Sequence, residues 1–361
     1  MDTDEKRYPL SVIVPIHRSD VDVRRCLLSL LKNPNLDLQI IVAANSDRKS
    51  ELQRINRLIP DLPCITLLNI PKAGKANAIN EALKFVENKY VLIGDADTLF
   101  MQKGINLCLE KLYSDESIVA ITGIVDPIIE NRIGAIQKFE YRRIFRIFRP
   151  FLNLFHANLI VSGCAGIFKT DALFTVGLYD CHTLGEDFEI TLRLHDYHIR
   201  HKMPYKIEYV DAPVAKTDVP KTLKALIRQR GRWFVGLIDV MWKYRKIMLH
   251  PFQYRTIFIP YMVTMLFEVA ETFSKWLLLG IGAWLSFIAK TSLLEILLIT
   301  GVCFIIFESL FNICFDKRLK MKRLSLVFGL TISLAAIQFV LKDTNFFYGI
   351  KMMRQNENRW K

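Results

Sequence analysis

Tyr90-Val-Leu-Ile-Gly-Asp-Ala-Asp-Thr98 is a short apolar run that ends in two aspartates one residue apart. Side chains at positions i and i+2 of a β-strand point to the same face, so Asp95 and Asp97 can converge on one point. Two carboxylates with room for water and phosphate oxygens suit Mg²⁺ or Mn²⁺ better than zinc. The carboxyl end of a strand is also where open α/β sheets hold nucleotides. Because Asp-x-Asp also occurs in ordinary turns, the pair alone leaves metal binding and a turn equally open.

Apolar strand patterns and helical patterns alternate on both sides of this stretch, from residue 9 to residue 125. The sequence predicts strands at 10–16, 38–43, 65–68, 90–93 and 118–121. Between them it predicts helices at 21–31, 50–58, 76–87 and 105–112. This alternation predicts an α/β fold with a mostly parallel sheet and helices on both of its faces.

The composition divides the 361-residue chain into two parts. Hydrophobic residues make up 51% of the chain and the mean hydropathy is +0.21, which is high for an ordinary soluble protein. The apolar residues concentrate after Pro251, so we expect a cytosolic domain at 1–250 and a transmembrane region at 251–361. Residues 1–7 are mostly charged rather than an apolar leader, which predicts a multi-pass protein of the cell membrane whose catalytic domain faces the cytoplasm.

Charge and cysteine usage narrow the classes of partner. The formal net charge of +13 fits an anionic lipid, a phosphorylated substrate or a nucleic acid. A membrane region ranks lipid and nucleotide-sugar above nucleic acid, so we expect no nucleic-acid partner. Seven scattered cysteines form no Cys-x-x-Cys pair, so neither a zinc site nor a disulfide framework is predicted.

Two basic segments follow or flank the predicted strands. Residues 71–80 form a Gly-containing turn into a helix, where Lys72 and Lys75 either approach a diphosphate at the helix N-terminus or only flank the helix start. Residues 133–155 place aromatic side chains and arginines on different faces of a helix that Pro150 should kink or end. This pattern predicts either a helix that lies in the membrane interface or a helix whose arginines face solvent and whose Phe side chains pack in a core. The residues of the two faces are Tyr141, Ile144, Phe145 and Phe148, and Arg142, Arg146 and Arg149.

Three further motifs are compatible with a binding site. Residues 161–169 place small side chains in a turn before a strand, where a ligand can approach the backbone or the chain can simply bend. Glu186 and Asp187 open an amphipathic helix, where acidic residues are ordinary at the first turn and can also be catalytic. Gln229, Arg232 and Trp233 lie on a basic helix, suited to a sugar ring and phosphate or to membrane anchoring.

Together these motifs resemble the membrane-bound inverting glycosyltransferases of family 2, the group that contains the synthases of hyaluronan, chitin, cellulose and poly-N-acetylglucosamine. The resemblance covers about residues 9–245, and residues 137–141 and 217–232 look most similar to the poly-N-acetylglucosamine and hyaluronan branch. It rests on the order and spacing of Asp95-Ala-Asp97, Gly163-Cys-Ala-Gly166, Gly185-Glu-Asp187 and Gln229-Arg-Gly-Arg-Trp233.

The resemblance implies a GT-A domain, a nucleotide-diphospho-sugar transferase fold that is Rossmann-like, with a UDP-sugar as donor. Asp95 would contact the nucleotide, and Asp95 and Asp97 would hold the Mg²⁺ or Mn²⁺ ion on the diphosphate. Asp187, next to Glu186, matches the general base that takes the proton of the acceptor hydroxyl. Inversion needs that one base and charge neutralisation on the leaving diphosphate. The residues matching the motif around the diphosphate and the acceptor are Gln229, Arg232 and Trp233.

Two departures from the family pattern weaken the prediction of uridine as the base. After the second strand, where acidic residues usually read the uracil, the chain has Ala43 and Ala44, and Asp47 is the nearest substitute. The loop after Pro15 also lacks the usual Asn-Glu pair. It offers His17, Arg18 and Asp20 instead.

The sequence predicts about three spans in the transmembrane region, preceded by interfacial helices within 131–160 and 222–250. Residues 324–341 are 18 residues without a charge, residues 293–313 form a second span, and residues 257–289 an interfacial or re-entrant segment with a span. The basic loop 316–323 should be cytosolic, which leaves the basic tail 351–361 outside, against the positive-inside rule. Intramembrane carboxylates indicate a site or channel, or burial against the catalytic domain; they are Glu268, Glu271 and Glu308.

Three functions remain open at this point. The first is an inverting hexosyltransferase (EC 2.4) that extends a β-linked polysaccharide in the membrane, alone, as an oligomer or with an accessory export subunit. The second transfers a single sugar to a lipid acceptor such as a polyprenyl phosphate, a ceramide or a diacylglycerol. The third is an inactive nucleotide-binding scaffold subunit, which the intact acidic motifs argue against.

Overall fold

A computed structural model describes residues 7–17, 22–71, 74–266 and the four residues 280, 281, 284 and 287. Within these ranges no helix is long and apolar enough to cross a membrane. Several predicted features lie outside the described residues. They are Arg18, Asp20, Lys72, Glu268, Glu271, Glu308, the spans at 293–313 and 324–341, the loop 316–323, the tail 351–361 and most of 257–289.

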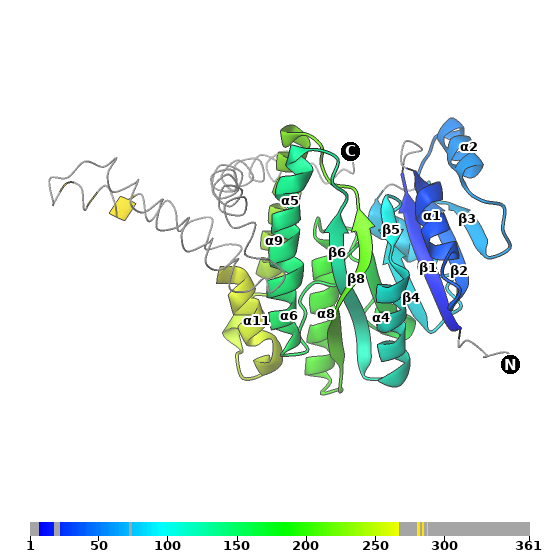
Figure 1. Cartoon of the computed structure of the whole chain (residues 1–361). Coiled ribbons are helices and arrows are strands. Elements are labelled where there is room, and N and C mark those ends of the chain that lie inside the picture. The colour runs from blue at the N-terminus through cyan, green and yellow to red at the C-terminus, as the bar shows by residue number, and fades with distance from the viewer. Residues whose placement is uncertain are drawn as a thin grey trace, which may run out of the picture.

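The described chain forms an eight-stranded sheet with the order β3-β2-β1-β4-β7-β6-β8-β5 (Figure 1). The strands are β1 Tyr8–Ile16, β2 Leu36–Ala44, β3 Ile65–Asn69, β4 Tyr90–Gly94, β5 Thr98–Phe100, β6 Ile118–Pro127, β7 Ala165–Lys169 and β8 Lys206–Thr217. The helices are α1 Val23–Leu31, α2 Lys49–Leu58, α3 Lys75–Leu83, α4 Gln102–Ser114, α5 Arg132–Arg143, α6 Arg149–Asn153, α7 Thr170–Thr175, α8 Glu186–Arg200, α9 Leu223–Lys243, α10 Lys246–Leu249 and α11 Arg255–Met265.

Helices cover both faces of the sheet because the central strands are apolar on both sides. Along β1, Val12 and Val14 face a core shared with α1, α4 and α5, whereas Ile13 faces a second core shared with α3, α7 and α8. This alternation follows the two-residue period of a strand. The prediction of an α/β fold with helices on both faces is therefore confirmed.

The prediction of a mostly parallel sheet holds in part, because four pairings of the described strands are parallel and three are antiparallel. Strands β3, β2, β1 and β4 pair in parallel, as do β6 and β8, but β7 is antiparallel to both β4 and β6, and β5 is antiparallel to β8. The sheet is thus mixed. Because β7 runs against β4, Ala165 pairs with Gly94, and the loop before β7 lies beside the aspartates that follow β4.

A π-helical turn at Ile144–Phe148 joins α5 to α6, so of the predicted kink or end at Pro150 the end does not occur. A π turn inserts an extra residue and rotates the following side chains around the helix axis. Arg149, expected on the polar face with Arg142 and Arg146, is consequently buried, and Tyr141 and Phe145 pack in the core.

A third apolar core packs α10 and α11 against α8 and α9. It contains residues of α8 to α11, including Phe188, Val240, Tyr254 and Tyr261. Hydroxyl groups in this core have partners: Tyr254 donates to Asp196 Oδ1 at 2.6 Å and Tyr261 donates to the Met241 carbonyl at 2.7 Å. The helices that carry Asp187 and Trp233 are therefore packed against each other.

Candidate active site

The predicted site residues lie at the carboxyl ends of β1 and β4, where the strand order of the sheet reverses. The chain runs from β1 outward to β3 and then returns to place β4 on the other side of β1. Such a switch point leaves a crevice outside the strand ends, which is the usual ligand position in open α/β sheets. His17 follows β1, and Asp95 and Asp97 follow β4.

Lys75, the first residue of α3, bridges the two acidic motifs. Its Nζ lies 2.5 Å from Asp95 Oδ1 and 3.8 Å from Glu186 Oε1, and it donates to the Gly163 carbonyl at 3.2 Å. Burial would lower the pKa of this ammonium, but the charges of Asp95 and Glu186 raise it above its usual range. Lys75 therefore stays charged and joins the end of β4, the loop before β7 and the start of α8.

Asp97 lies beside the end of β8. The Thr217 hydroxyl donates to Asp97 Oδ1 at 3.3 Å, because the antiparallel pair Thr98↔Thr217 places the two residues side by side. Burial and the charges of Asp95 and Asp218 raise the pKa of Asp97 to about 7. The charge of Lys75 and the hydrogen bond from Thr217 oppose this rise in the pKa only in part.

The residues around Asp97 fit a divalent cation that is bound partly through a ligand. Within the part of the chain that the structure describes, no three acidic, His or Cys side chains converge into a complete metal cage. Proteins usually bind Mg²⁺ through one or two carboxylates, and water and phosphate oxygens complete its coordination shell. A cation there would also neutralise the carboxylate whose pKa burial raises.

Asp187 lies in the first turn of α8 and faces the small-residue loop before β7. Its Oδ2 accepts the Gly163 N–H at 3.3 Å, and its Oδ1 accepts the N–H of Phe188 at 2.8 Å. A Cβ on Gly163 would lie 3.3 Å from Asp187 Oδ2, a tight contact, which explains a glycine at this position. The loop thus orients the carboxylate that the sequence predicts as the base.

The Gln-Arg-Gly-Arg-Trp segment lies on α9 and approaches the site through Arg232. Burial raises the pKa of Glu186, while the charges of Lys75 and Arg232 oppose that rise, so Arg232 lies within electrostatic range of the acidic pair. Arg232 and Trp233 are exposed, and Gln229 is half-buried. The structure therefore brings together Lys75, Asp95, Glu186, Asp187 and Arg232.

Arg230, which sequence reasoning passed over, is the buried member of this segment. It pairs with Glu140 at 2.6 Å, donates to Gln229 Oε1 at 2.7 Å, and its guanidinium lies 4.0 Å from the Trp233 ring centre. Arg230 thus holds both Gln229 and Trp233 against α5. The opposite charges of Glu140 and Arg230 were visible in the sequence, but nothing local paired them across 90 residues.

Known proteins are similar to this chain in sequence and in fold. Residues 11–175 match the model of the glycosyl transferase family 2. Residues 11–175 are therefore similar to a family 2 glycosyltransferase domain. Poly-beta-1,6-N-acetyl-D-glucosamine synthase of Staphylococcus aureus is 30% identical over 58% of this chain and 50% of its own length. The Staphylococcus epidermidis enzyme of that name is 29% identical over 64% of this chain and 55% of its own length.

The chain spans about half the length of these curated relatives. Among solved structures, the mannosyltransferase PcManGT of Pyrobaculum calidifontis, in complex with GDP-Man and Mn²⁺, has a similar fold, with a TM-score of 0.62. It is 18% identical and covers 92% of this chain and 87% of its own. The described α/β fold with its mixed sheet is therefore GT-A-like.

The residues predicted to lie near the nucleotide base follow β1 and β2. Asp47, proposed as a substitute for the missing acidic residues, is exposed, and Pro15 is buried within β1. His17 Nδ1 donates to the Asn45 carbonyl at 2.7 Å. The Asn45 side chain, missed in the sequence, accepts the Gly74 N–H at 3.0 Å and donates to the Ile70 carbonyl at 3.3 Å. A polar residue directly after β2 was the signal for it.

Arg149 is a buried cation whose charge interacts with that of Asp187. Only 6% of its surface is exposed, and its Nη1 has no hydrogen-bond partner in the described part of the chain. Burial lowers the pKa of Arg149 to about 10, although the charges of Tyr209 and Asp187 act in the opposite direction. A buried guanidinium without full hydrogen bonding destabilises a fold.

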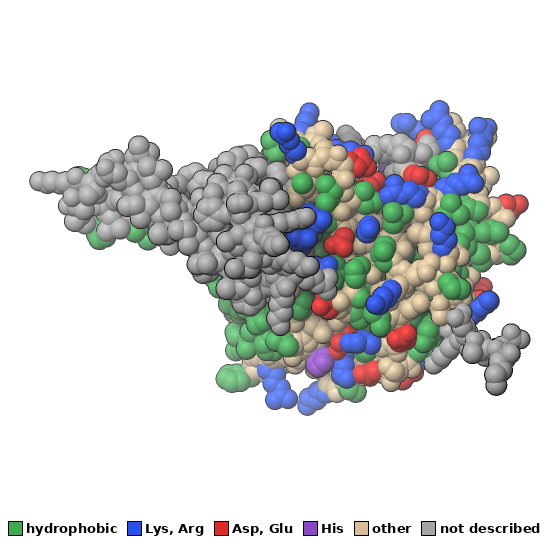
Figure 2. Space-filling model, viewed as in Figure 1, with side chains coloured by type: hydrophobic (Ala, Val, Ile, Leu, Met, Phe, Trp, Pro, Cys, Tyr) green, Lys and Arg blue, Asp and Glu red, His purple; other side chains and the backbone are tan. Residues whose placement is uncertain are grey.

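Apolar side chains gather on the described surface at the end of the domain. They lie at the lower left of Figure 2, over the region of α11 in Figure 1. Phe252 is 94% exposed, and further apolar side chains between residues 242 and 266 are exposed as well. These are Trp242, Leu249, Ile259, Met262 and Leu266.

Proposed function

We propose that this domain transfers a sugar from a UDP-sugar, with inversion, to a growing β-linked polysaccharide. The observation that carries the proposal is the bridge of Lys75 between Asp95, after β4, and Glu186, before Asp187. This bridge supports one shared site for Asp95 and the proposed base, because Asp187 directly follows Glu186. Both relatives described above are named as synthases of a β-linked polymer, which favours a polysaccharide product and N-acetylglucosamine as the sugar.

The reaction needs a single displacement. The acceptor hydroxyl oxygen bonds to the anomeric carbon of the donor while the bond from that carbon to the diphosphate oxygen breaks. Asp187 takes the hydroxyl proton, and the nucleoside diphosphate leaves. Because the oxygen attacks from the face opposite the leaving group, an α-linked donor gives a β-linked product.

The charged residues of the site match these steps. Gly163 and Phe188 hold the Asp187 carboxylate through their N–H groups. Lys75 and Arg232 supply positive charge for the leaving diphosphate. Asp95 and Asp97 would hold Mg²⁺ or Mn²⁺, which would add charge neutralisation at the diphosphate.

Membrane attachment is part of the proposal. The exposed apolar side chains around α10 and α11 include Phe252 and Leu266, which directly precede the apolar sequence after residue 266. Exposed apolar surface of this kind marks an interaction with a membrane or another protein. We place the domain on the cytoplasmic side of the membrane, with its acceptor supplied there.

Product sizing tests the function. Purified full-length protein in lipid is incubated with labelled UDP-N-acetylglucosamine and Mn²⁺, and the product is sized. A long polymer supports the proposal. An organic-soluble lipid with one sugar replaces it with the lipid-acceptor reaction, and no turnover with any UDP-sugar indicates a scaffold subunit. Asp187→Asn serves as the blank, and Asp171→Asn, an exposed aspartate in the first turn of α7, serves as the matched control.

A further inference from the structure

One face of α9 runs from the site to the contact with α8. Its residues are spaced three and four apart, which places them on the same side of a helix. Arg232, at the start of this face, lies within electrostatic range of Glu186. The residues of the face are Gln229, Arg232, Gly236, Asp239 and Lys243.

The two backbones touch in the middle of this face. A Cβ on Gly236 would lie 2.7 Å from the Gly185 nitrogen and 2.8 Å from the Leu184 carbonyl carbon. A Cβ on Gly185 would lie 3.2 Å from the Gly236 carbonyl. These distances are too short for a carbon atom against backbone, so only glycine at position 236 permits this approach. The crossing point is one residue before Glu186 and two before Asp187.

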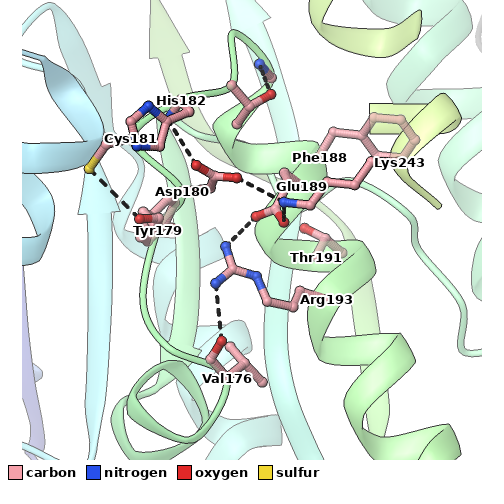
Figure 3. Close-up of polar contacts among 12 residues, drawn as sticks. Val176, Tyr179, Asp180, Cys181, His182, Phe188, Glu189, Thr191, Arg193 and Lys243 are labelled. Atoms are coloured by element: carbon pink, nitrogen blue, oxygen red, sulfur yellow. Dashed lines mark hydrogen bonds and ion pairs between the residues drawn. The ribbon is translucent and has the colours of Figure 1, made fainter. Parts of the chain in front are cut away.

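Polar contacts also join the C-terminal half of α9 to α8 and to the loop before α8. The Thr183 hydroxyl donates to Asp239 Oδ2 at 3.3 Å. Lys243 Nζ lies 2.7 Å from Glu189 Oε1 and 2.8 Å from Asp180 Oδ2 (Figure 3). Glu189 is fully buried. The lysine therefore ties the end of α9 to both α8 and the loop before it.

Glu189 has further partners that hold it in place. It pairs with Arg193 one turn later on α8, and Figure 3 shows that arginine reaching toward Glu189 and the Val176 carbonyl. The Tyr244 hydroxyl donates to the same Oε1 atom at 3.0 Å. A buried carboxylate with this many donors is a rigid anchor for Lys243.

We propose that the α8–α9 crossing sets the distance between Asp187 and the Gln229–Arg232 segment, with Gly236 and Lys243 as positioning residues. Arg232 lies one helical turn before Gly236, about 6 Å along the axis, so a shift at the crossing moves it directly. Neither positioning residue touches the donor-side aspartates in any described contact. This inference rests on the proposed function, because it concerns the geometry of the transfer step.

Gly236→Ala is the first test. The methyl group pushes α9 away from Gly185, so kcat for sugar transfer should fall at least about tenfold, since misplacing a catalytic constellation by about 1 Å costs that much or more. UDP affinity, measured by titration calorimetry, should fall by less than kcat, because Lys75, which no described contact joins to the crossing, still faces the diphosphate. The matched control is Gly134→Ala in α5, where a Cβ meets nothing closer than 3.5 Å and kcat should not change.

Lys243 supplies a second test in case the alanine variant does not fold. Lys243 is partly exposed, so Lys243→Met should leave a folded protein with kcat lowered about threefold to tenfold. Lys243→Arg keeps the charge and should restore most of the rate. A wild-type kcat in folded Gly236→Ala or in Lys243→Met overturns the proposal. So does an equal loss of kcat and UDP affinity, which indicates a structural role alone.

A crosslinking measurement separates this proposal from the proposed function. Cysteines are placed at positions 183 and 239 in a Cys181→Ser background, and a short bis-maleimide joins the loop before α8 to α9. The crosslinking rate should fall when Gly236→Ala is added and should not change with Gly134→Ala. An unchanged rate overturns the crossing as the determinant of spacing, whether or not the protein transfers sugar. If wild type transfers no sugar from any UDP-sugar while the rate falls, the proposed function fails instead.

Discussion

The two sides of the site are built in different ways. The proposed donor side consists of residues that follow β4, and Asp95 and Asp97 take their place from the pairings of β4 and β5. The other side consists of helix starts and helix faces, and Asp187 and Arg232 take their place from contacts between α8 and α9. Lys75 joins the two sides. Strand ends are set locally, whereas the helix side depends on contacts between residues far apart in the sequence.

Among substitutions on the proposed donor side, Asp97→Asn should lower the rate of sugar transfer most. Removing this carboxylate should lower transfer at least about a hundredfold and abolish the dependence of UDP affinity on Mn²⁺. Titration calorimetry with and without EDTA measures that dependence. Full activity with Mn²⁺-dependent UDP binding in the variant would remove Asp97 from the metal site. Asp171→Asn is the control for loss of an aspartate.

The same variant also tests the pKa of Asp97. The pKa is raised from 3.8 to about 7, so in metal-free protein this group contributes stability below pH 4 that is lost as the pH rises through 7. Asp97→Asn should therefore raise the Tm of EDTA-treated protein at pH 8 and change it little at pH 4. Calorimetric scans at the two pH values measure this difference, and an equal effect at both contradicts the shift.

On the side formed by α8 and α9, a substitution of Arg230 should lower the transfer rate by a smaller factor. Arg230→Met leaves Glu140 without its partner and frees Gln229 and Trp233 from α5. We expect a loss of about 2 kcal/mol in the free energy of unfolding and a transfer rate about tenfold lower, with UDP affinity little changed. Urea unfolding and kinetics measure these effects. Arg228→Met, an exposed arginine on the same helix, should do neither.

The smallest expected effect is a gain in stability. Arg149→Met removes a buried guanidinium whose Nη1 has no partner among the described residues. We expect the free energy of unfolding to rise by about 1 kcal/mol, because a well-packed apolar side chain replaces an unsatisfied charge. Exposed Arg132→Met should leave it unchanged. A fall for Arg149→Met instead would show that the positive charge near Asp187 stabilises the folded protein.

The first half of the fold was predictable because its signals are local. The strand predicted at 90–93 is β4 Tyr90–Gly94, and the helix predicted at 105–112 lies within α4 Gln102–Ser114. Strand β8 was missed because Pro213 interrupts its pattern and register shifts break its alternation. Strand β5 has three residues, too few to show a period.

The candidate site divides in the same way. Asp95, Asp97, Glu186 and Asp187 stand at element ends, where a sequence pattern marks them. The partners of Lys75, the anchor Arg230 and the bridge at Asn45 depend on contacts with residues 20 to 111 positions away. Arg149 was assigned to the wrong face because no sequence signal marks a π turn. Family resemblance supplied the roles, and only the structure supplied the partners.

Asp187→Asn tests the central claim most directly, because it separates the two sides in one protein. UDP affinity with Mn²⁺ and sugar transfer are measured on the same purified preparation. The account predicts transfer at least about a thousandfold lower, the loss of a general base, with UDP affinity within about twofold of wild type. Retained transfer, or a parallel loss of UDP affinity, would contradict the assignment of Asp187 as the base on a side separate from the donor.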